Sequence, residues 1–334
     1  MVGGLSEIER REFMSNNEVL LGSGLSRVRH NKRYIFWFYV LNVLLAWLGA
    51  GAFGNVIHQI LDHSLHAESL VRGFDMGTLV ELFARPEFGP TMASTAPAMH
   101  FAFLFLFLTV LFVPGVLQGY AATYRLPRDD FFRACGRNLW RFIRLMIVAG
   151  IVMGAVAGAL FGLEAALVKA AGESTNEMLP FEMKVVTLII IFLVMTALRI
   201  WFDLAQADVV LSDQPAVRRS IGRGFRHMWR NLGRLLGSYV VTAMVAGIIL
   251  LLGLCVWMKF VPPASVFGAV VVSQFTLLLL LIPRFWQRGI AVSYYLQSMV
   301  EPIAVHPFTP APVITPIAPP APVIPNSPAE PQGI

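Results

Sequence analysis

Residues 145–168 read LMIVAGIVMGAVAGALFGLEAALV, a run in which Glu164 is the one charged side chain. A helix rises about 1.5 Å per residue, so about 20 apolar residues cross the roughly 30 Å hydrocarbon core of a bilayer. Five more runs of this kind occupy residues 34–57, 99–122, 185–207, 236–258 and 264–283. Together the six runs predict an all-α, polytopic membrane bundle of six transmembrane helices.

The composition of the 334 residues agrees with this prediction. Hydrophobic residues make up 56% of the chain and charged residues 14%, whereas soluble domains have roughly 45–50% and about 25%. The two cysteines, Cys135 and Cys255, are too far apart and too few for a disulfide framework or a cysteine-based zinc site. The runs divide the chain into a polar segment at 1–33, a membrane domain at 34–304 and a tail at 305–334.

The positions of Lys and Arg predict the orientation of the bundle. Of the 26 basic residues, 20 fall before the first run, in the second and fourth connections, or at the end of the sixth run. Basic residues concentrate on the cytoplasmic side of membrane proteins, so both termini are expected in the cytoplasm. The net charge of +6 therefore reflects topology, and no nucleic-acid partner is indicated.

Two stretches of the chain match when they are shifted by 93 residues. Residues 132–141 read FRACGRNLWR and residues 225–234 read FRHMWRNLGR, with six identities in ten positions. We call them the first arm and the second arm. Each precedes an apolar run that crosses in the same direction, so they predict a parallel internal repeat.

Both arms are predicted to be amphipathic helices. At about 100° per residue, arginines occupy one face and apolar side chains the other, which is typical of a helix lying in the membrane interface. Such arginines either anchor and orient the bundle or form a specific site for anionic lipid head groups or a partner. The candidate lipid-binding residues are Arg133, Arg137, Arg141, Arg144, Arg223, Arg226, Arg230 and Arg234.

The stretch 131–145, FFRACGRNLWRFIRL, with Ala207-Asp208 and an arm beginning near Ala216, resembles a group of bacterial polytopic membrane proteins that are mostly uncharacterised. These proteins are loosely similar to the membrane domain of some glycerophosphodiester phosphodiesterases. The resemblance covers about residues 100–300. It implies a membrane fold and a bacterial inner membrane, and it carries no catalytic residues across.

Two features inside the apolar runs are candidate functional positions. Arg199 and Asp203 are spaced i, i+4, so they can pair with each other or handle a proton or substrate inside the bundle. Glycines at every fourth position leave a flat helix face, which favours close packing within the chain or against a second copy. These helix-packing candidates are Gly150, Gly154, Gly158 and Gly162.

Two further segments suggest ligands or partners. His58, Asp62 and His66 have a spacing that fits one metal ion, although a wet amphipathic helix has the same pattern. The tail contains ten prolines, so it is expected to be extended and to act as a spacer or as a docking peptide for a protein partner.

No catalytic template is present in the sequence. The chain lacks GxSxG, HExxH, GxxxxGK[ST] and GxGxxG patterns, so we expect a protein that is not an enzyme and needs no cofactor. Two functions remain. The first is a membrane component that binds lipids or assembles with partners, and the second is a small-solute or lipid transporter with a cavity near Arg199 and Asp203.

Overall fold

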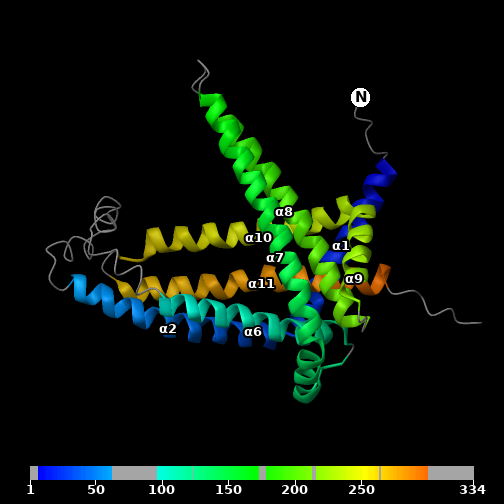
Figure 1. Ribbon diagram of the computed structural model, residues 1–334, viewed down its shortest axis with the longest axis horizontal. Coiled ribbons are helices and arrows are strands. Elements are labelled where there is room, and N and C mark those ends of the chain that lie inside the picture. The colour runs from blue at the N-terminus through cyan, green and yellow to red at the C-terminus, as the bar shows by residue number, and fades with distance from the viewer. Residues whose placement is uncertain are drawn as a thin grey trace, which may run out of the picture. The chain divides into compact units, whose positions relative to one another are not determined.

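A computed structural model describes residues 7–61, 96–122, 124–172, 178–212, 216–262 and 265–299. Within these ranges the chain forms eight α-helices and no strand (Figure 1), which confirms the all-α prediction. The helices are α1 (Glu7–His30), α2 (Arg33–Leu61), α6 (Ala96–Ala121), α7 (Arg128–Gly172), α8 (Leu179–Leu211), α9 (Val217–Arg230), α10 (Leu232–Phe260) and α11 (Val266–Ser298).

Five of these helices, α6, α7, α8, α10 and α11, are long and apolar enough to cross a membrane. They fit a multi-pass membrane protein, as the apolar runs predict. In α2 the apolar stretch Arg33–Gly49 is shorter than those of the other five helices. The sixth transmembrane helix therefore stays a prediction.

The first arm is helical as predicted, but it is not a helix of its own. That arm is the beginning of α7, which runs for 45 residues from Arg128 to Gly172. Asn138 lies inside this helix, and its amide Nδ2 donates to the carbonyl of Ala134 at 3.1 Å. The second arm differs, since α9 ends at Arg230 and α10 begins at Leu232.

The N-terminal segment is also helical and packs against the bundle. Helix α1 lies along α11, and the two meet at a pair of glycines. A Cβ atom at Gly289 would lie 2.6 Å from the carbonyl oxygen of Gly24, so only glycine permits this approach. Leu20 and Val28, one turn to either side of Gly24, are also buried, Leu20 in a cluster with Ile290 of α11 and Val28 in a cluster with Val292 of α11.

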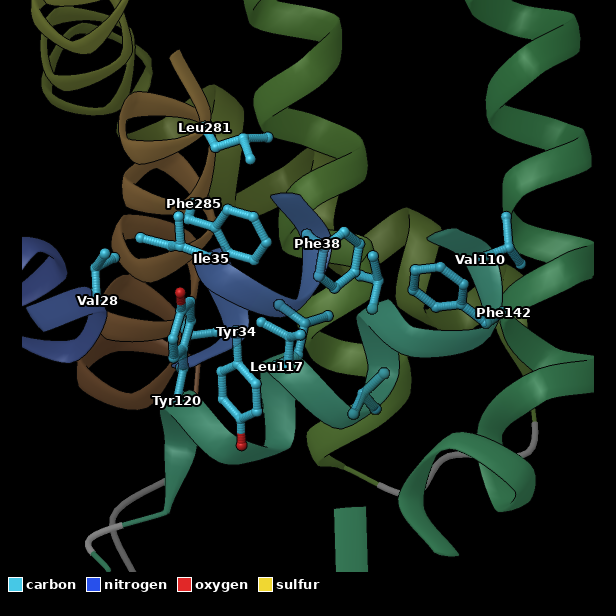
Figure 2. Close-up of a cluster of buried hydrophobic side chains, with 14 residues drawn as sticks. Val28, Tyr34, Ile35, Phe38, Val110, Leu117, Tyr120, Phe142, Leu281 and Phe285 are labelled. Atoms are coloured by element: carbon cyan, nitrogen blue, oxygen red, sulfur yellow. The ribbon is translucent and has the colours of Figure 1, made fainter. Parts of the chain in front are cut away.

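The buried core lies at the end of the helices that carries the arms. Figure 2 shows Tyr34 and Phe38 of α2 beside Leu117 of α6, Phe142 of α7 and Phe285 of α11. Two neighbouring clusters join α8 to its partners, one around Ile200, Leu204, Leu235, Tyr239 and Ile290, the other around Leu145, Ala149, Phe202, Ala205 and Val209.

The opposite halves of the same helices are apolar and largely exposed. In α7 the side chains of Ile151, Phe161 and Leu163 are at least half exposed, and Leu251 and Leu252 of α10 are similar. A bilayer solvates such surface, because lipid tails are as apolar as leucine. Packing between helices is therefore concentrated near the arms.

Candidate functional site

Helix α9 has one buried face and one face of arginine and aromatic residues. Ser220, Gly224 and Met228, each four residues apart, are buried against the protein. At Gly224 an added Cβ would lie 3.1 Å from the backbone of Trp201 and Ala205, so α9 rests directly on α8. The opposite face exposes Arg218, Arg219, Phe225, Arg226, Trp229 and Arg230. We call this face the α9 surface.

The aromatic side chains of the α9 surface are held in a defined arrangement. The rings of Phe225 and Trp229 stack with centroids 5.9 Å apart, and Phe225 meets Trp201 of α8 edge-on at 5.1 Å. The indole Nε1 of Trp201 donates to the carbonyl of Ile221 at 2.8 Å. Trp229 is nonetheless 67% exposed. Exposed tryptophan beside arginine is typical of the membrane–water interface.

The first arm carries a comparable surface on α7. Arg133, Arg137 and Arg144 are exposed there, and Trp140 is 63% exposed. The guanidinium of Arg144 lies over the Trp140 ring, 5.0 Å from its centroid. Arg133 is 3.8 Å from Asp130, an exposed pair that contributes little. Both arms therefore expose arginines among aromatic rings.

Arg223, a predicted lipid-binding residue, lies on a different side of α9. Its Nη2 is 2.8 Å from Oδ2 of Asp208, whose side chain is completely buried in α8. A buried carboxylate needs such a cation, because an unpaired charge away from water is costly. The pair therefore fixes α9 to α8. The sequence indicates this pair only through Asp208, the single acid inside the apolar stretch 204–211, LAQADVVL.

His227 faces the protein from the same helix. The ring lies 6.5 Å from that of Tyr294, whose hydroxyl donates to the His227 carbonyl at 3.4 Å. Burial lowers the pKa of His227 from 6.5, and Arg230 lowers it further. The imidazole is accordingly neutral at pH 7.

Arg199 and Asp203 form the ion pair that their spacing predicts. Arg199 Nε is 3.8 Å from Asp203 Oδ2, and the hydroxyl of Tyr239 in α10 donates to the same oxygen at 2.9 Å. The same hydroxyl lies 3.2 Å from the backbone carbonyl oxygen of Gln287 in α11, and Nε2 of Gln287 donates to Thr242 of α10 at 3.0 Å. The sequence did not reveal these partners, because they come from helices far apart in the chain.

The glycine face of α7 does not pack within the described part of the protein. A Cβ atom added at Gly150, Gly154, Gly158 or Gly162 would meet no atom within 4 Å. A contact with a second copy stays a prediction. Of the metal candidates, the side chain of His58, and the whole of Asp62 and His66, lie outside the described residues, as does the proline-rich tail.

Comparison with known proteins gives no relative for this chain. No protein family, no curated protein and no solved structure matches it.

Proposed function

We propose that the protein is a lipid-interacting component of the bacterial inner membrane, with both termini in the cytoplasm and six transmembrane helices. The observation that supports this most directly is the exposure of arginine among aromatic rings on both arms. Arg226 and Arg230 flank Trp229 on the α9 surface, and Arg144 covers Trp140 on α7. Guanidinium groups bind lipid phosphates while the rings lie at the level of the head groups.

A parallel internal repeat is part of this proposal, and matching contacts support it. Phe112 of α6 packs against Phe131 of the α7 N-terminus, with ring centroids 6.4 Å apart. At positions 93 residues later, Ala205 of α8 contacts Gly224 of α9. The same pair of positions therefore joins each arm to the preceding apolar helix.

The test measures whether the arms select anionic lipids. The full chain is placed in nanodiscs that contain brominated phosphatidylglycerol or brominated phosphatidylcholine. Because the chain has seven tryptophans, the difference in quenching between the wild type and W140F/W229F reports which lipid lies near Trp140 and Trp229. We expect a preference for phosphatidylglycerol that weakens in salt, because each arginine near an anionic surface contributes about 1 kcal/mol. A triple variant, R137Q/R226Q/R230Q, should remove most of that preference.

The matched control removes three charges from the other ends of the helices. Lys169, Lys184 and Lys259 are exposed and lie near the ends of α7, α8 and α10 that are far from the arms. The variant K169Q/K184Q/K259Q should keep the wild-type preference. Equal quenching by both lipids in the wild type, or equal loss in the two triple variants, would contradict lipid binding by the arms.

A transporter with a cavity near Arg199 and Asp203 is the second candidate. It is favoured by the polar network of Asp203, Tyr239, Thr242 and Gln287 inside an apolar bundle. The double variant R199A/D203A is expressed at the wild-type level in a strain that lacks the gene. It should fail to correct the defect that loss of the gene causes. Full restoration would eliminate a transport role for this pair.

A further inference from the structure

Helix α1 has a face that the rest of the described structure leaves uncovered. On one side of the helix Leu20, Gly24 and Val28 are buried against the protein, and Gly24 meets Gly289 of α11. Four exposed residues follow one another along a different side of the helix: Glu18, Gly22, Leu25 and Arg29. We call these four residues the α1 seam.

The spacing of the α1 seam is that of a contact between two helices. Its residues are separated by four, three and four positions, as are the core positions of a two-stranded coiled coil. Leu25 provides a knob, since its side chain is 40% exposed. Gly22 leaves a hole, because a Cβ atom added there would meet no atom within 4 Å. The α1 seam therefore contains both halves of a knob-into-hole contact.

The α1 seam is complementary to itself when a second copy of α1 runs antiparallel to the first. Glu18 and Arg29 are equally far from the point midway between residues 23 and 24, and so are Gly22 and Leu25. A two-fold axis through that point places Glu18 opposite Arg29 of the second copy, and Gly22 opposite Leu25 of the second copy. Each contact then occurs twice, which gives two ion pairs and two knob-into-hole contacts.

The charges of the α1 seam favour a second copy over lipid as the partner. Neither Glu18 nor Arg29 has an ion-pair partner among the side chains that the structure describes. Helix α9, by comparison, carries several arginines and no acid. An anionic lipid surface attracts arginine but repels the carboxylate of Glu18, whereas an antiparallel copy pairs both charges.

The orientation of α1 permits this pairing within one membrane. Figure 1 shows α1 steeply inclined to α2 and α11, although it packs against α11 near Gly289. Because α11 is long and apolar enough to cross a membrane, a helix inclined to it extends along the membrane surface. Two such helices can lie antiparallel there without inverting either chain, and the two-fold axis between them then follows the membrane normal.

We propose that the α1 seam joins two copies of this chain in an antiparallel, two-fold dimer at the membrane surface. The α1 seam is about 16 Å long at about 1.5 Å per residue, so it buries less area than a standard interface. Confinement of both copies to one membrane reduces the entropy cost of association. We therefore expect a dimer in bilayers that dissociates when detergent dilutes it. This inference goes beyond lipid binding by the arms and uses none of their residues.

The first experiment tests the antiparallel register by cross-linking in membranes. C255S removes the exposed native cysteine, and Cys135 is buried. In this background two differently tagged full-length chains, one with E18C and one with R29C, are produced together and treated with a short bismaleimide. We expect cross-linking between the two chains at least about fivefold above that of either variant with itself, because the two-fold axis brings residue 18 to residue 29. Equal cross-linking of E18C with itself would overturn the proposal.

Charge reversal tests the ion pairs of the α1 seam. Donor- and acceptor-labelled full chains are mixed in liposomes, and energy transfer between them is measured as added lipid dilutes the protein. E18R and R29E each place like charges opposite each other, so each should weaken dimerisation at least about tenfold. E18R/R29E exchanges the signs and restores both pairs, so it should recover wild-type dimerisation within about threefold.

Two results of the energy-transfer measurement would contradict the proposal. If lipid covers the α1 seam, the wild type gives only the energy transfer of random mixing, and no dimer exists to be weakened. If the double variant E18R/R29E is no better than the single reversals, the two charges do not face each other.

A matched pair of glycine variants tests the hole. G22L fills it and should weaken dimerisation at least about tenfold, whereas helix content should not fall, because the space around Gly22 is open in the single chain. The control G222L adds the same side chain to α9, at a glycine with equally open surroundings, and should change dimerisation less than about twofold. Equal effects of the two variants would overturn the proposal. The quenching preference of the arms should be unchanged in G22L, so the two proposals fail separately.

Discussion

The two arms share six of ten residues, yet one continues into its transmembrane helix and the other breaks from it. In α7 the chain passes through Asn138 without interruption. At the equivalent Asn231 the helix ends, and the amide Nδ2 donates to the hydroxyl of Tyr294 on α11 at 2.7 Å. A tertiary partner is available to one asparagine, whereas the other bonds its own helix.

The arms and the helix turns that follow them nevertheless bury several equivalent positions, although the buried Ala134 and Asn138 correspond to the partly buried His227 and Asn231. Cys135, Phe142, Leu145 and Ala149 are buried in α7, and the residues 93 positions later are buried as well: Met228, Leu235, Ser238 and Thr242. The shared pattern therefore determines which face packs inward. It does not determine the contacts that hold the arm, which are aromatic for the first arm and an ion pair and a glycine for the second.

The largest effect is expected from removing the ion pair of the second arm. R223Q leaves the completely buried Asp208 without a cation, which costs about 3 kcal/mol. R133Q, which removes the exposed pair of the first arm, should cost less than about 1 kcal/mol. The free energy of unfolding in mixed detergent micelles measures both. Equal effects would show that the arms are held alike.

The next largest effects are expected from changing the contact that joins each arm to a neighbouring helix. F131A removes a ring stacked on Tyr34 at 5.4 Å and should cost about 2–3 kcal/mol of unfolding free energy, because the side chain is partly buried. G224A places a Cβ 3.1 Å from the α8 backbone and should cost about 1–2 kcal/mol. Unfolding in mixed micelles tests both, and a neutral G224A would contradict the close approach.

The two asparagines should respond differently to alanine. N231A loses the bond to Tyr294 and should reduce the free energy of unfolding by about 1 kcal/mol. N138A removes a bond within the helix together with an oxygen that has no partner in the described structure, so the change should stay within about 0.5 kcal/mol. The free energy of unfolding in mixed micelles measures both variants. A larger loss of unfolding free energy for N138A than for N231A would contradict this comparison.

The smallest effect concerns pH. His227 stands where the first arm has Ala134, and its pKa is lowered from 6.5 by burial and by Arg230, Arg223 and Arg226, with Asp208 acting in the opposite sense. The unfolded chain then binds the proton more readily, so stability falls as the pH falls from about 7 to 5. H227A should flatten this slope in a pH series of unfolding curves. An unchanged slope in H227A would show that other groups cause the pH dependence of stability.

Parts of the candidate site were predictable because their chemistry is local. The arginine faces of the arms follow from helical periodicity, and Arg199 and Asp203 pair as their spacing of four predicts. Tyr239 and Gln287 join the same region from helices that no local pattern pairs with α8. Arg223 was assigned to the lipid face, because periodicity alone does not show that a buried Asp208 faces it.

The sequence by itself determined the class of this protein, because helices that cross a bilayer must be apolar over their whole length and satisfy their own backbone hydrogen bonds. It also placed arginines and apolar residues on largely opposite faces of each arm. Only the tertiary structure decided that α1 packs against α11 through Gly24 and Gly289, that Asn231 ends a helix and Asn138 does not, and that Tyr239 of α10 bonds Asp203 of α8. These features depend on which helices become neighbours, and apolar runs of similar composition do not specify their partners.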